Sequence, residues 1–221
     1  MTAIIVASGR PASGEVWKTW VRTGDLIVGA DGGAAQALAC GVAPDVVIGD
    51  MDSLPGDARA SLAASGCEFI THPRAKDETD LELALSYVVE RGFQEIIIFG
   101  ALGGRLDHTL ANLLLLALPR FAAVRVRIVD DSEEALLVRD GHAVTVDGRP
   151  GDTLSLLPLG GDARGVTTSG LTWALDGDTL AFGSSRGVSN EMTGSTARIA
   201  VHEGCVLVVH QVGSSRLEIG D

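Results

Sequence analysis

Short apolar runs alternate with stretches of helix-forming residues over the first 130 positions of the chain. The apolar runs end in polar or glycine-rich turns, and the stretches between them mix apolar and polar residues. Strands are predicted at residues 3–8, 26–30, 45–49, 68–71, 95–100 and 124–129. Helices are predicted at residues 15–22, 34–40, 56–65, 80–91 and 107–118. This alternation predicts an α/β domain with a mostly parallel, Rossmann-like sheet covered on both faces.

The pattern changes after the strand at 124–129. Short β-like pieces then follow one another, separated by turn pairs such as Asp140-Gly141, Asp147-Gly148, Asp176-Gly177 and Glu203-Gly204. The pieces are residues 135–139, 142–146, 153–158, 165–169, 179–182, 196–202 and 205–211. Their spacing predicts an all-β sandwich or a barrel-like second domain. We place the boundary near residues 128–134, which gives domains 1–130 and 131–221.

Acidic residues outnumber basic ones in this chain. Its 221 residues include 29 Asp and Glu against 17 Lys and Arg, a formal net charge of −12 at pH 7. Nucleic acids and anionic membranes repel such a protein, which excludes non-specific binding to either. A substrate that bears phosphate groups would then need metal ions, so the positions of the acidic residues become the main question.

The sequence predicts neither a membrane span nor a disulfide framework. The longest apolar run covers residues 113–118, far short of the roughly 20 residues that cross a bilayer, and the first eight residues lack the basic region of a secretion signal. The cysteines Cys40, Cys67 and Cys205 are widely separated and odd in number, which predicts reduced, structural thiols. We therefore expect a cytoplasmic protein.

Aspartates follow the ends of the predicted strands. They are Asp31 in A-D-G-G, Asp50 and Asp52 in G-D-M-D-S-L, Asp77 and Asp80 in K-D-E-T-D, and Asp107 in G-G-R-L-D-H. The carboxyl ends of parallel strands meet at one edge of a sheet, where ligands gather. Carboxylates that converge there repel one another unless hard cations lie between them, and such oxygen ligands suit Mg²⁺. The pattern thus favours a metal site at this edge.

Local structure is the alternative explanation for the same residues. Asp50 could start a turn, and Asp52 or Ser53 could cap a helix. Thr79 and Glu82 have the spacing of a capping box at the start of the helix predicted at 80–91. This explanation suits one segment alone better than it suits all of them together.

Phosphate-binding features accompany the acids. The pairs Gly32-Gly33 and Gly103-Gly104 each follow a predicted strand and precede a helix, so their backbone N–H groups could hold anions. Lys76 and Arg105 bring cationic side chains to the same edge. Neither a GxxxxGK[ST] motif nor a GxGxxG motif is present, so no standard nucleotide-binding loop applies. A tight strand-to-helix turn explains a glycine pair equally well.

Six segments, taken together and in order, resemble the thiamine pyrophosphokinase family. They are A-D-G-G-A at 30–34, G-D-M-D-S-L at 49–54, T-D at 79–80, G-G-R-L-D-H at 103–108, G-L-T-W at 170–173 and S-N at 189–190. The resemblance implies an α/β catalytic domain, a C-terminal β-sandwich, and a homodimer whose thiamine sites lie between subunits. It also implies that the pyrophosphoryl group of ATP is transferred to the hydroxyl of thiamine, giving thiamine diphosphate and AMP.

The resemblance also assigns roles to individual residues. It implies that Asp50, Asp52 and Asp80 are Mg²⁺ ligands, and that the further catalytic residues are Asp31, Asp77, Arg105 and Asp107. Contacts to the ATP phosphates fall to Gly32, Gly33, Lys76, Thr79, Gly103, Gly104 and Arg105. On the thiamine side, Trp173 packs on the substrate, and Ser189 and Asn190 lie close to it. An aromatic face and acidic surroundings both attract a thiazolium cation.

Some roles and some rival functions stay open at this stage. Trp173 could be a core aromatic of the sandwich, and His108 could be a base or could hydrogen-bond locally. A haloacid-dehalogenase-like phosphatase is a rival because D-M-D-S resembles its nucleophile loop and Asp130-Asp131 its distal acidic pair, although that loop usually follows the first strand. A pyrophosphokinase for a pterin alcohol would share the ATP chemistry. A non-catalytic sensor of thiamine or a nucleotide would not need the several acids.

Overall fold

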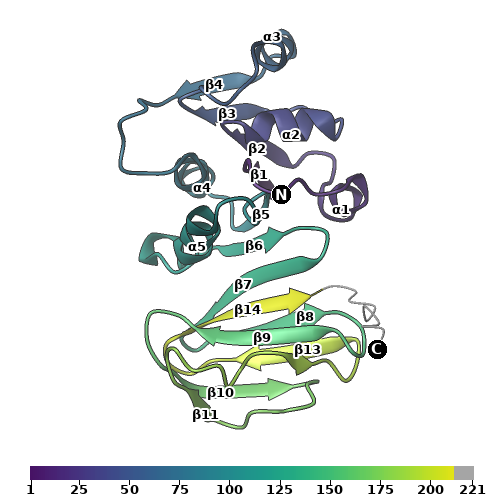
Figure 1. Ribbon diagram of the computed structural model, residues 1–221, viewed down its shortest axis with the longest axis vertical. Coiled ribbons are helices and arrows are strands. Elements are labelled where there is room, and N and C mark those ends of the chain that lie inside the picture. Colours follow the sequence, from purple (N-terminus) through teal and green to yellow (C-terminus); the bar gives the residue numbers. More distant parts are fainter. Residues whose placement is uncertain (212–221) are drawn as a thin grey trace, which may run out of the picture. The chain divides into compact units, whose positions relative to one another are not determined.

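The computed structural model describes residues 1–211, and the chain divides into two compact units, Met1–Asp131 and Ser132–Asp221. The first unit alternates strands and helices (Figure 1). Its strands are β1 (Ala3–Val6), β2 (Leu26–Ala30), β3 (Val46–Gly49), β4 (Glu68–Thr71), β5 (Glu95–Phe99) and β6 (Arg125–Val129). Its helices are α1 (Gly14–Trp20), α2 (Gly33–Ala39), α3 (Gly56–Ala64), α4 (Asp80–Glu90), α5 (Leu106–Leu115) and the 3₁₀ turn η1 (Pro119–Phe121).

The strands of the first unit form a parallel sheet in the order β6-β5-β1-β2-β3-β4. The chain steps from β1 outward to β4, then returns to place β5 on the other side of β1. The loops after β1 and β5 therefore leave the sheet in opposite directions. Such a switch in direction opens a crevice at the carboxyl ends of the strands, where open α/β sheets bind their ligands.

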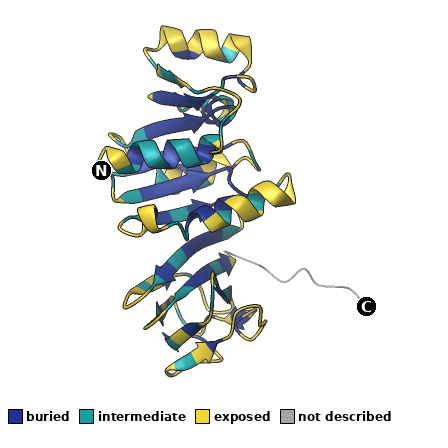
Figure 2. Cartoon of the chain, turned by 90° about the vertical axis from the view of Figure 1, so that its left-hand side faces the viewer, coloured by how far each residue is buried: buried dark blue, intermediate teal, exposed yellow. Residues whose placement is uncertain are grey.

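Helices cover both faces of this sheet (Figure 1). On one face, Trp17 of α1 and Ala37 of α2 pack against Ile4 and Val6 of β1, and the Trp17 ring lies 4.7 Å from the ring of Phe99. On the other face lie α4 and α5, and α4 contacts β1, β2 and β3. Strands β1, β2, β3 and β5 are almost fully buried, the edge strand β4 is exposed or half-buried, and the outer helix faces are exposed (Figure 2). Burial on both faces explains why the strands are continuous apolar runs without alternation.

The second unit is built from two antiparallel sheets. One has the strand order β12-β9-β14-β7 and the other the order β11-β10-β13-β8. Their bounds are β7 (Glu133–Arg139), β8 (Ala143–Asp147), β9 (Thr153–Pro158), β10 (Ala163–Ser169), β11 (Asp178–Leu180), β12 (Asn190–Glu191), β13 (Thr196–Ala200) and β14 (Cys205–Gln211). Alternate side chains from both sheets, such as Val206, Val208 and Ile199, form one apolar core. The predicted combination of an α/β domain with a β-sandwich is confirmed.

Two elements were missed in the sequence. Strand β12 spans only Asn190–Glu191, too short to show a period of two, and its pairing with Leu154 and Thr153 of β9 comes from tertiary structure. The turn η1 begins at a proline that the pattern left in a loop. Elsewhere the predicted and observed bounds differ by a few residues at the ends of elements, where local signals are weakest.

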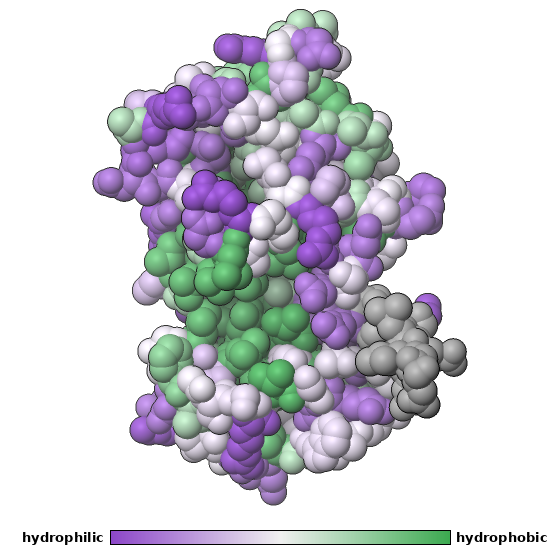
Figure 3. Space-filling view, in the orientation of Figure 1, coloured by the Kyte–Doolittle hydropathy of each residue, from purple (hydrophilic) through white to green (hydrophobic). Residues whose placement is uncertain are grey.

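Several surface features complete the description. Leu106, Leu110 and Leu114 form an exposed apolar stripe on α5. Figure 3 shows hydrophobic surface in green over the region of this helix. Among the described residues, no helix combines the length and the apolar character that a bilayer crossing requires.

The three cysteines are unpaired and partly buried, and burial raises the pKa of the Cys67 thiol to about 11.

Candidate active site

A cavity of about 520 Å³ opens at the carboxyl ends of the strands in the first unit. Residues from the ends of β1, β2, β3 and β5, from the loop before α4 and from the start of α5 line it. They are Ala7, Ser8, Gly9, Ala30, Asp31, Asp50, Arg74, Lys76, Glu78, Thr79, Asp80, Leu81, Gly100, Ala101, Gly103, Gly104, Arg105, His108 and Asn112. The cavity thus lies at the crevice that the strand order predicts.

Backbone hydrogen bonds join the loops after β1 and β5 on one side of this cavity. The Gly9 N–H donates to the Gly100 carbonyl at 2.7 Å, and the Arg10 N–H donates to the Leu102 carbonyl at 2.7 Å. Gly100 has a φ of +67°, and a Cβ there would lie 2.2 Å from the Ala7 carbonyl oxygen. Only glycine fits this position, so the loops are held in a single close arrangement.

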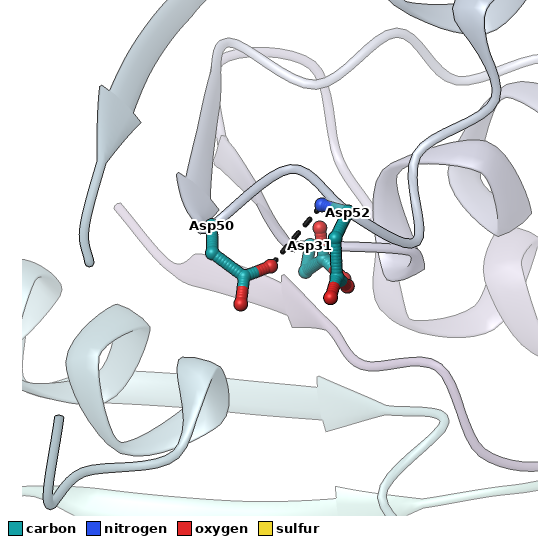
Figure 4. Close-up of side chains that lie close together, drawn as sticks. All are labelled: Asp31, Asp50 and Asp52. Atoms are coloured by element: carbon teal, nitrogen blue, oxygen red, sulfur yellow. Dashed lines mark hydrogen bonds between the residues drawn. The ribbon is translucent and has the colours of Figure 1, made fainter. Parts of the chain in front are cut away.

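Three aspartates converge beside the cavity: Asp31 after β2, and Asp50 and Asp52 after β3 (Figure 4). One carboxylate oxygen from each lies within 4.8 Å of the others. The Asp52 N–H donates to Asp50 Oδ1 at 3.1 Å. Asp31 has a φ of 45° and the intervening Met51 a φ of 64°, conformations that are costly for non-glycine residues and are common at functional sites. The turns therefore aim the carboxylates at one another at a cost in backbone energy.

Within this trio, the charge of Asp31 is poorly compensated by the protein. Burial raises the pKa of Asp31, and the charges of Asp80 and Asp50 raise it further, against the opposing effects of Ser53 and the Gly32 N–H. Asp31 is 6% exposed, and its Oδ1 has no hydrogen-bond partner among the described residues. A buried carboxylate oxygen without a partner, next to two more carboxylates, fits a bound divalent cation.

Asp50 is in a different environment. The Asp52 N–H lowers the pKa of Asp50, and the charges of Lys76 and Arg74 contribute in the same direction. Its carboxylate is therefore ionised over the whole neutral range. Ionised oxygens of this kind are the ligands that Mg²⁺ prefers.

We expect Asp31→Asn to stabilise the metal-free protein at pH 7 and to have little effect near pH 3. Because the pKa of Asp31 is raised on folding, the folded protein holds this proton more tightly than the unfolded chain does. The stability that this carboxyl group contributes is present at pH values below its ordinary pKa of 3.8. It is lost as the pH rises through the higher pKa of the folded protein. The amide introduced by Asp31→Asn does not ionise, so the variant does not lose this stability as the pH rises.

Urea unfolding in EDTA at both pH values measures this effect, with Asp57→Asn as the control. Asp57 is an exposed acid in the first turn of α3. A lower free energy of unfolding for Asp31→Asn at pH 7 would contradict the electrostatic account.

Asp80 and Lys76 form an ion pair at the start of α4. Lys76 Nζ lies 2.5 Å from Asp80 Oδ1, and the two side chains are 13% and 28% exposed. Asp80 also lies close to the trio: a Cβ on Gly49 would be 3.0 Å from Asp80 Oδ1 and 2.9 Å from the Asp31 Cβ. The structure thus brings Asp31 into contact with Asp50 and Asp52 and leaves Asp80 held by Lys76. The predicted metal set of Asp50, Asp52 and Asp80 stays a prediction.

Four residues of the G-G-R-L-D-H segment, Gly103, Gly104, Arg105 and His108, also line the cavity. Gly103 and Gly104 have φ values of 75° and 71° and line the cavity ahead of α5. Arg105 and Asp107 form an exposed ion pair, 2.5 Å from Nη2 to Oδ2, and this contact lowers the pKa of Asp107. Asp107 Oδ1 also accepts from the His108 N–H at 3.0 Å. The Arg105 guanidinium therefore lines the cavity, and among the described residues the exposed Asp107 carboxylate is its side-chain partner.

Some predicted site residues have structural roles or lie outside the cavity lining. Gly33 packs so closely that a Cβ would lie 1.9 Å from the Val6 carbonyl oxygen, which explains this glycine without a ligand; Gly32 is also outside the lining. Thr79 Oγ1 accepts from the Glu82 N–H at 3.2 Å and caps α4, while it also lines the cavity. Asp77 is exposed and lies outside the lining.

The sequence reasoning missed several residues of the lining. Ser8 follows β1, and a search of every strand end would have found it. Arg74 and Glu78 lie in the loop that carries Lys76, and Arg74 Nε is 3.7 Å from Asp52 Oδ2. Asn112 is a buried polar residue of α5 whose Nδ2 donates to the Ala101 carbonyl at 2.8 Å. No local pattern distinguishes Asn112 from an exposed helix residue.

A second hollow, of about 220 Å³, lies in the second unit. It is lined by Trp173, Arg186, Val188, Ser189 and Asn190, so the three predicted thiamine contacts do come together. Trp173 is 61% exposed, so the alternative that it is a core aromatic is wrong. Ser189 has a φ of 60°. Among the described residues, the only non-glycine residues with positive φ are therefore Asp31, Met51 and Ser189, all beside the two hollows.

Comparison with known families assigns a description to each unit. Residues 17–128 match the model "Thiamin pyrophosphokinase, catalytic domain", and residues 141–206 match "Thiamin pyrophosphokinase, vitamin B1 binding domain". The first match contains the aspartate trio and most of the residues that line the large cavity, although Ala7, Ser8 and Gly9 of that lining precede it. The second contains the hollow around Trp173.

Individual proteins show the same similarity. Thiamine pyrophosphokinase 1 from rice is 31% identical over 165 residues, covering 71% of this chain and 62% of the relative. The Bacillus subtilis thiamine pyrophosphokinase structure has a TM-score of 0.86 at 25% identity and covers 96% of this chain and 99% of that one. The Geobacillus thermodenitrificans structure has a TM-score of 0.84 at 28% identity and covers 98% and 100%. The chain thus spans less than two thirds of the rice relative and nearly all of the two bacterial ones.

Proposed function

Because this chain belongs to the thiamin pyrophosphokinase family, we propose that it transfers the pyrophosphoryl group of ATP to the hydroxyl of thiamine. The hydroxyl oxygen attacks the β-phosphorus of ATP. A new oxygen–phosphorus bond forms, the bridge between the α- and β-phosphates breaks, and the hydroxyl proton passes to solvent. The products are thiamine diphosphate and AMP.

The observation that carries this proposal is the meeting of acidic and cationic groups at one cavity. Asp31, Asp50 and Asp52 converge, and Lys76 and Arg105 lie on the lining of the same cavity. The carboxylates would hold Mg²⁺, with Asp80 beside them. A bound magnesium ion supplies neutralisation of phosphate charge and orientation of the polyphosphate.

The remaining contribution of the chain is to position ATP. Lys76 and Arg105 provide two cations for the phosphates, and Gly103 and Gly104 line the same cavity. Phosphoryl-type transfer needs positioning and charge stabilisation more than covalent help from the protein. No strong base is therefore required. His108 could act as a base or could only form local hydrogen bonds, and the proposal is compatible with both roles.

We place the thiamine site around Trp173, with Ser189 and Asn190, and we propose a homodimer in which this site is completed by the α/β unit of the partner subunit. An indole face attracts a thiazolium cation. The exposed leucine stripe of α5 and the exposed Phe182 are apolar surfaces of the kind that association buries.

One assay tests the proposed reaction. Purified protein is incubated with thiamine, ATP and Mg²⁺, and AMP and ADP are measured separately. AMP that forms only when thiamine is present supports the proposal. ADP formation would contradict it. A preference for a pterin alcohol, or a trapped aspartyl-phosphate on Asp50, would contradict it and support the corresponding rival.

We expect Arg105→Ala to raise the KM for ATP roughly 10- to 100-fold, the range for losing a charge-assisted hydrogen bond of about 1.5–3 kcal/mol. The KM for thiamine should change little, because a guanidinium is suited to polyphosphate and not to a cationic acceptor. Steady-state kinetics with each substrate varied in turn measures both constants.

Arg125→Ala is the matched control, since Arg125 is an exposed arginine in an ion pair with Glu95 at the start of β6, at the opposite end of the strands. A loss confined to thiamine binding in Arg105→Ala would show that the phosphate assignment is mistaken.

A further inference from the structure

The Trp173 backbone is held by the side chain of a single residue, Asn190. The Trp173 N–H donates to Asn190 Oδ1 at 3.1 Å, and Asn190 Nδ2 donates to the Trp173 carbonyl at 2.8 Å. Oδ1 also accepts from the Glu191 N–H at 2.9 Å. Asn190 is 7% exposed, whereas Trp173 is 61% exposed. A buried amide thus fixes the main chain beneath an exposed indole.

The amide lies next to a short antiparallel bridge. Leu171 and Met192 form an isolated bridge, the Thr193 N–H donates to the Gly170 carbonyl at 3.0 Å, and the Thr172 N–H donates to the Glu191 carbonyl at 2.9 Å. Beyond this bridge, the Asn190 side chain bonds both the N–H and the carbonyl of Trp173. A carboxamide can do this because it carries both a donor and an acceptor, as a peptide group does.

Asn190 is itself anchored to the interior of the sandwich. It pairs with Leu154 of β9, and the preceding Ser189 N–H donates to Ser155 Oγ at 3.0 Å. Two residues on, the Met192 N–H donates to the Asp152 carbonyl at 2.9 Å, and the Asp152 carboxylate lies 3.1 Å from Nε2 of the buried His210. The clamp on Trp173 is therefore attached to a rigid, buried framework.

We propose that Asn190 is a positioning residue that acts through Trp173 and does not act by touching thiamine. This inference rests on the proposed function, and it changes the role that the family resemblance suggests for Asn190. Both acceptor positions of Oδ1 are occupied, and one of the two Nδ2 hydrogens is used. The amide holds the 170–173 loop so that the indole stands beside Val188 and Ser189 in the small hollow.

A double-mutant cycle tests this proposal. Asn190→Ala should raise the KM for thiamine by up to about thirtyfold, the most that losing the indole contact would cost, with kcat and the KM for ATP within about twofold. In the Trp173→Ala background, Asn190→Ala should add less than twofold. Asn190→Asp keeps the acceptor and loses the donor to the Trp173 carbonyl. Its KM for thiamine should therefore lie between those of the unsubstituted protein and Asn190→Ala.

Thr167→Val is the matched control. Thr167 Oγ1 accepts from the Gly177 N–H at 3.1 Å, so this variant also loses one hydrogen bond between a side chain and the backbone of a turn in the second unit. Its KM for thiamine should stay unchanged. An Asn190→Ala effect that persists in the Trp173→Ala background would show direct substrate contact and overturn the proposal, as would an unchanged KM in Asn190→Ala.

A spectroscopic test is independent of catalysis. In protein labelled with 5-fluorotryptophan, the ¹⁹F signal of Trp173 is the one lost in Trp173→Phe. Asn190→Ala should shift or broaden that signal while the signals of Trp17 and Trp20 stay in place. An unchanged Trp173 signal refutes the clamp even if the enzyme forms thiamine diphosphate. A shifted signal in a protein that forms none refutes the proposed function and leaves the clamp supported.

Discussion

Asp52→Asn should lower kcat at least about a hundredfold at saturating Mg²⁺ and leave the fold intact. The substitution removes one of the charges that would hold Mg²⁺ in the proposed site, and a change of this size corresponds to about 2.7 kcal/mol of transition-state stabilisation. The Asp52 main-chain N–H, which donates to Asp50 Oδ1, is unaffected. AMP formation at a series of Mg²⁺ concentrations measures the effect, with thermal unfolding as the check on folding.

Asp57→Asn provides the comparison, because it removes the same charge from an exposed position on α3. It should retain normal turnover. If Asp52→Asn also retains near-normal turnover at saturating Mg²⁺, the trio is structural and the metal assignment is mistaken.

Trp173→Ala should raise the KM for thiamine by a factor of between about two and thirty. This range is the equivalent of roughly 0.5–2 kcal/mol of stacking and cation–π attraction. The KM for ATP and the free energy of unfolding should barely change, because the indole is exposed. A core aromatic would instead cost roughly 3–5 kcal/mol of stability. Steady-state kinetics and urea unfolding of the same preparation separate these outcomes. A stability loss of that size would contradict the exposed position.

Mixed subunits test whether the site around Trp173 is shared. If each site uses the trio of one subunit and the indole of the other, a heterodimer of Trp173→Ala and Asp52→Asn has one site with both defects and one with neither. Activity should then partly return when the two inactive or impaired preparations are mixed and subunit exchange has been demonstrated. Absence of recovery would rule out sites between subunits.

The sequence-based account of the fold succeeded where local patterning is strong. Buried parallel strands are short apolar runs, and the strand 26–30 was predicted at the bounds that β2 has. Capping also acts locally, and the Thr79–Glu82 spacing predicted the hydrogen bond that starts α4. Strand β12 could not be predicted in this way, because its two residues pair with β9 through contacts more than 30 positions apart.

The candidate site, too, was predicted from the sequence in part, and the tertiary structure decided the rest. That acids would gather at the strand ends followed from the sequence, since the alternation of strands and helices makes the sheet parallel. Which acids meet was decided by the turns after β2 and β3, whose left-handed residues Asp31 and Met51 bring Asp31 to Asp50 and Asp52. Lys76, four residues before Asp80, holds that carboxylate in an ion pair.

By itself the sequence determined the two kinds of domain, the family and the residue types at each site, because strand and helix periods and short motifs depend on neighbouring residues. Only the tertiary structure decided that Trp173 is exposed, that Gly33 serves packing, and that the Asn190 amide is occupied by the Trp173 backbone. These properties depend on which distant segments approach one another, and the free energy of such contacts does not appear in any local pattern.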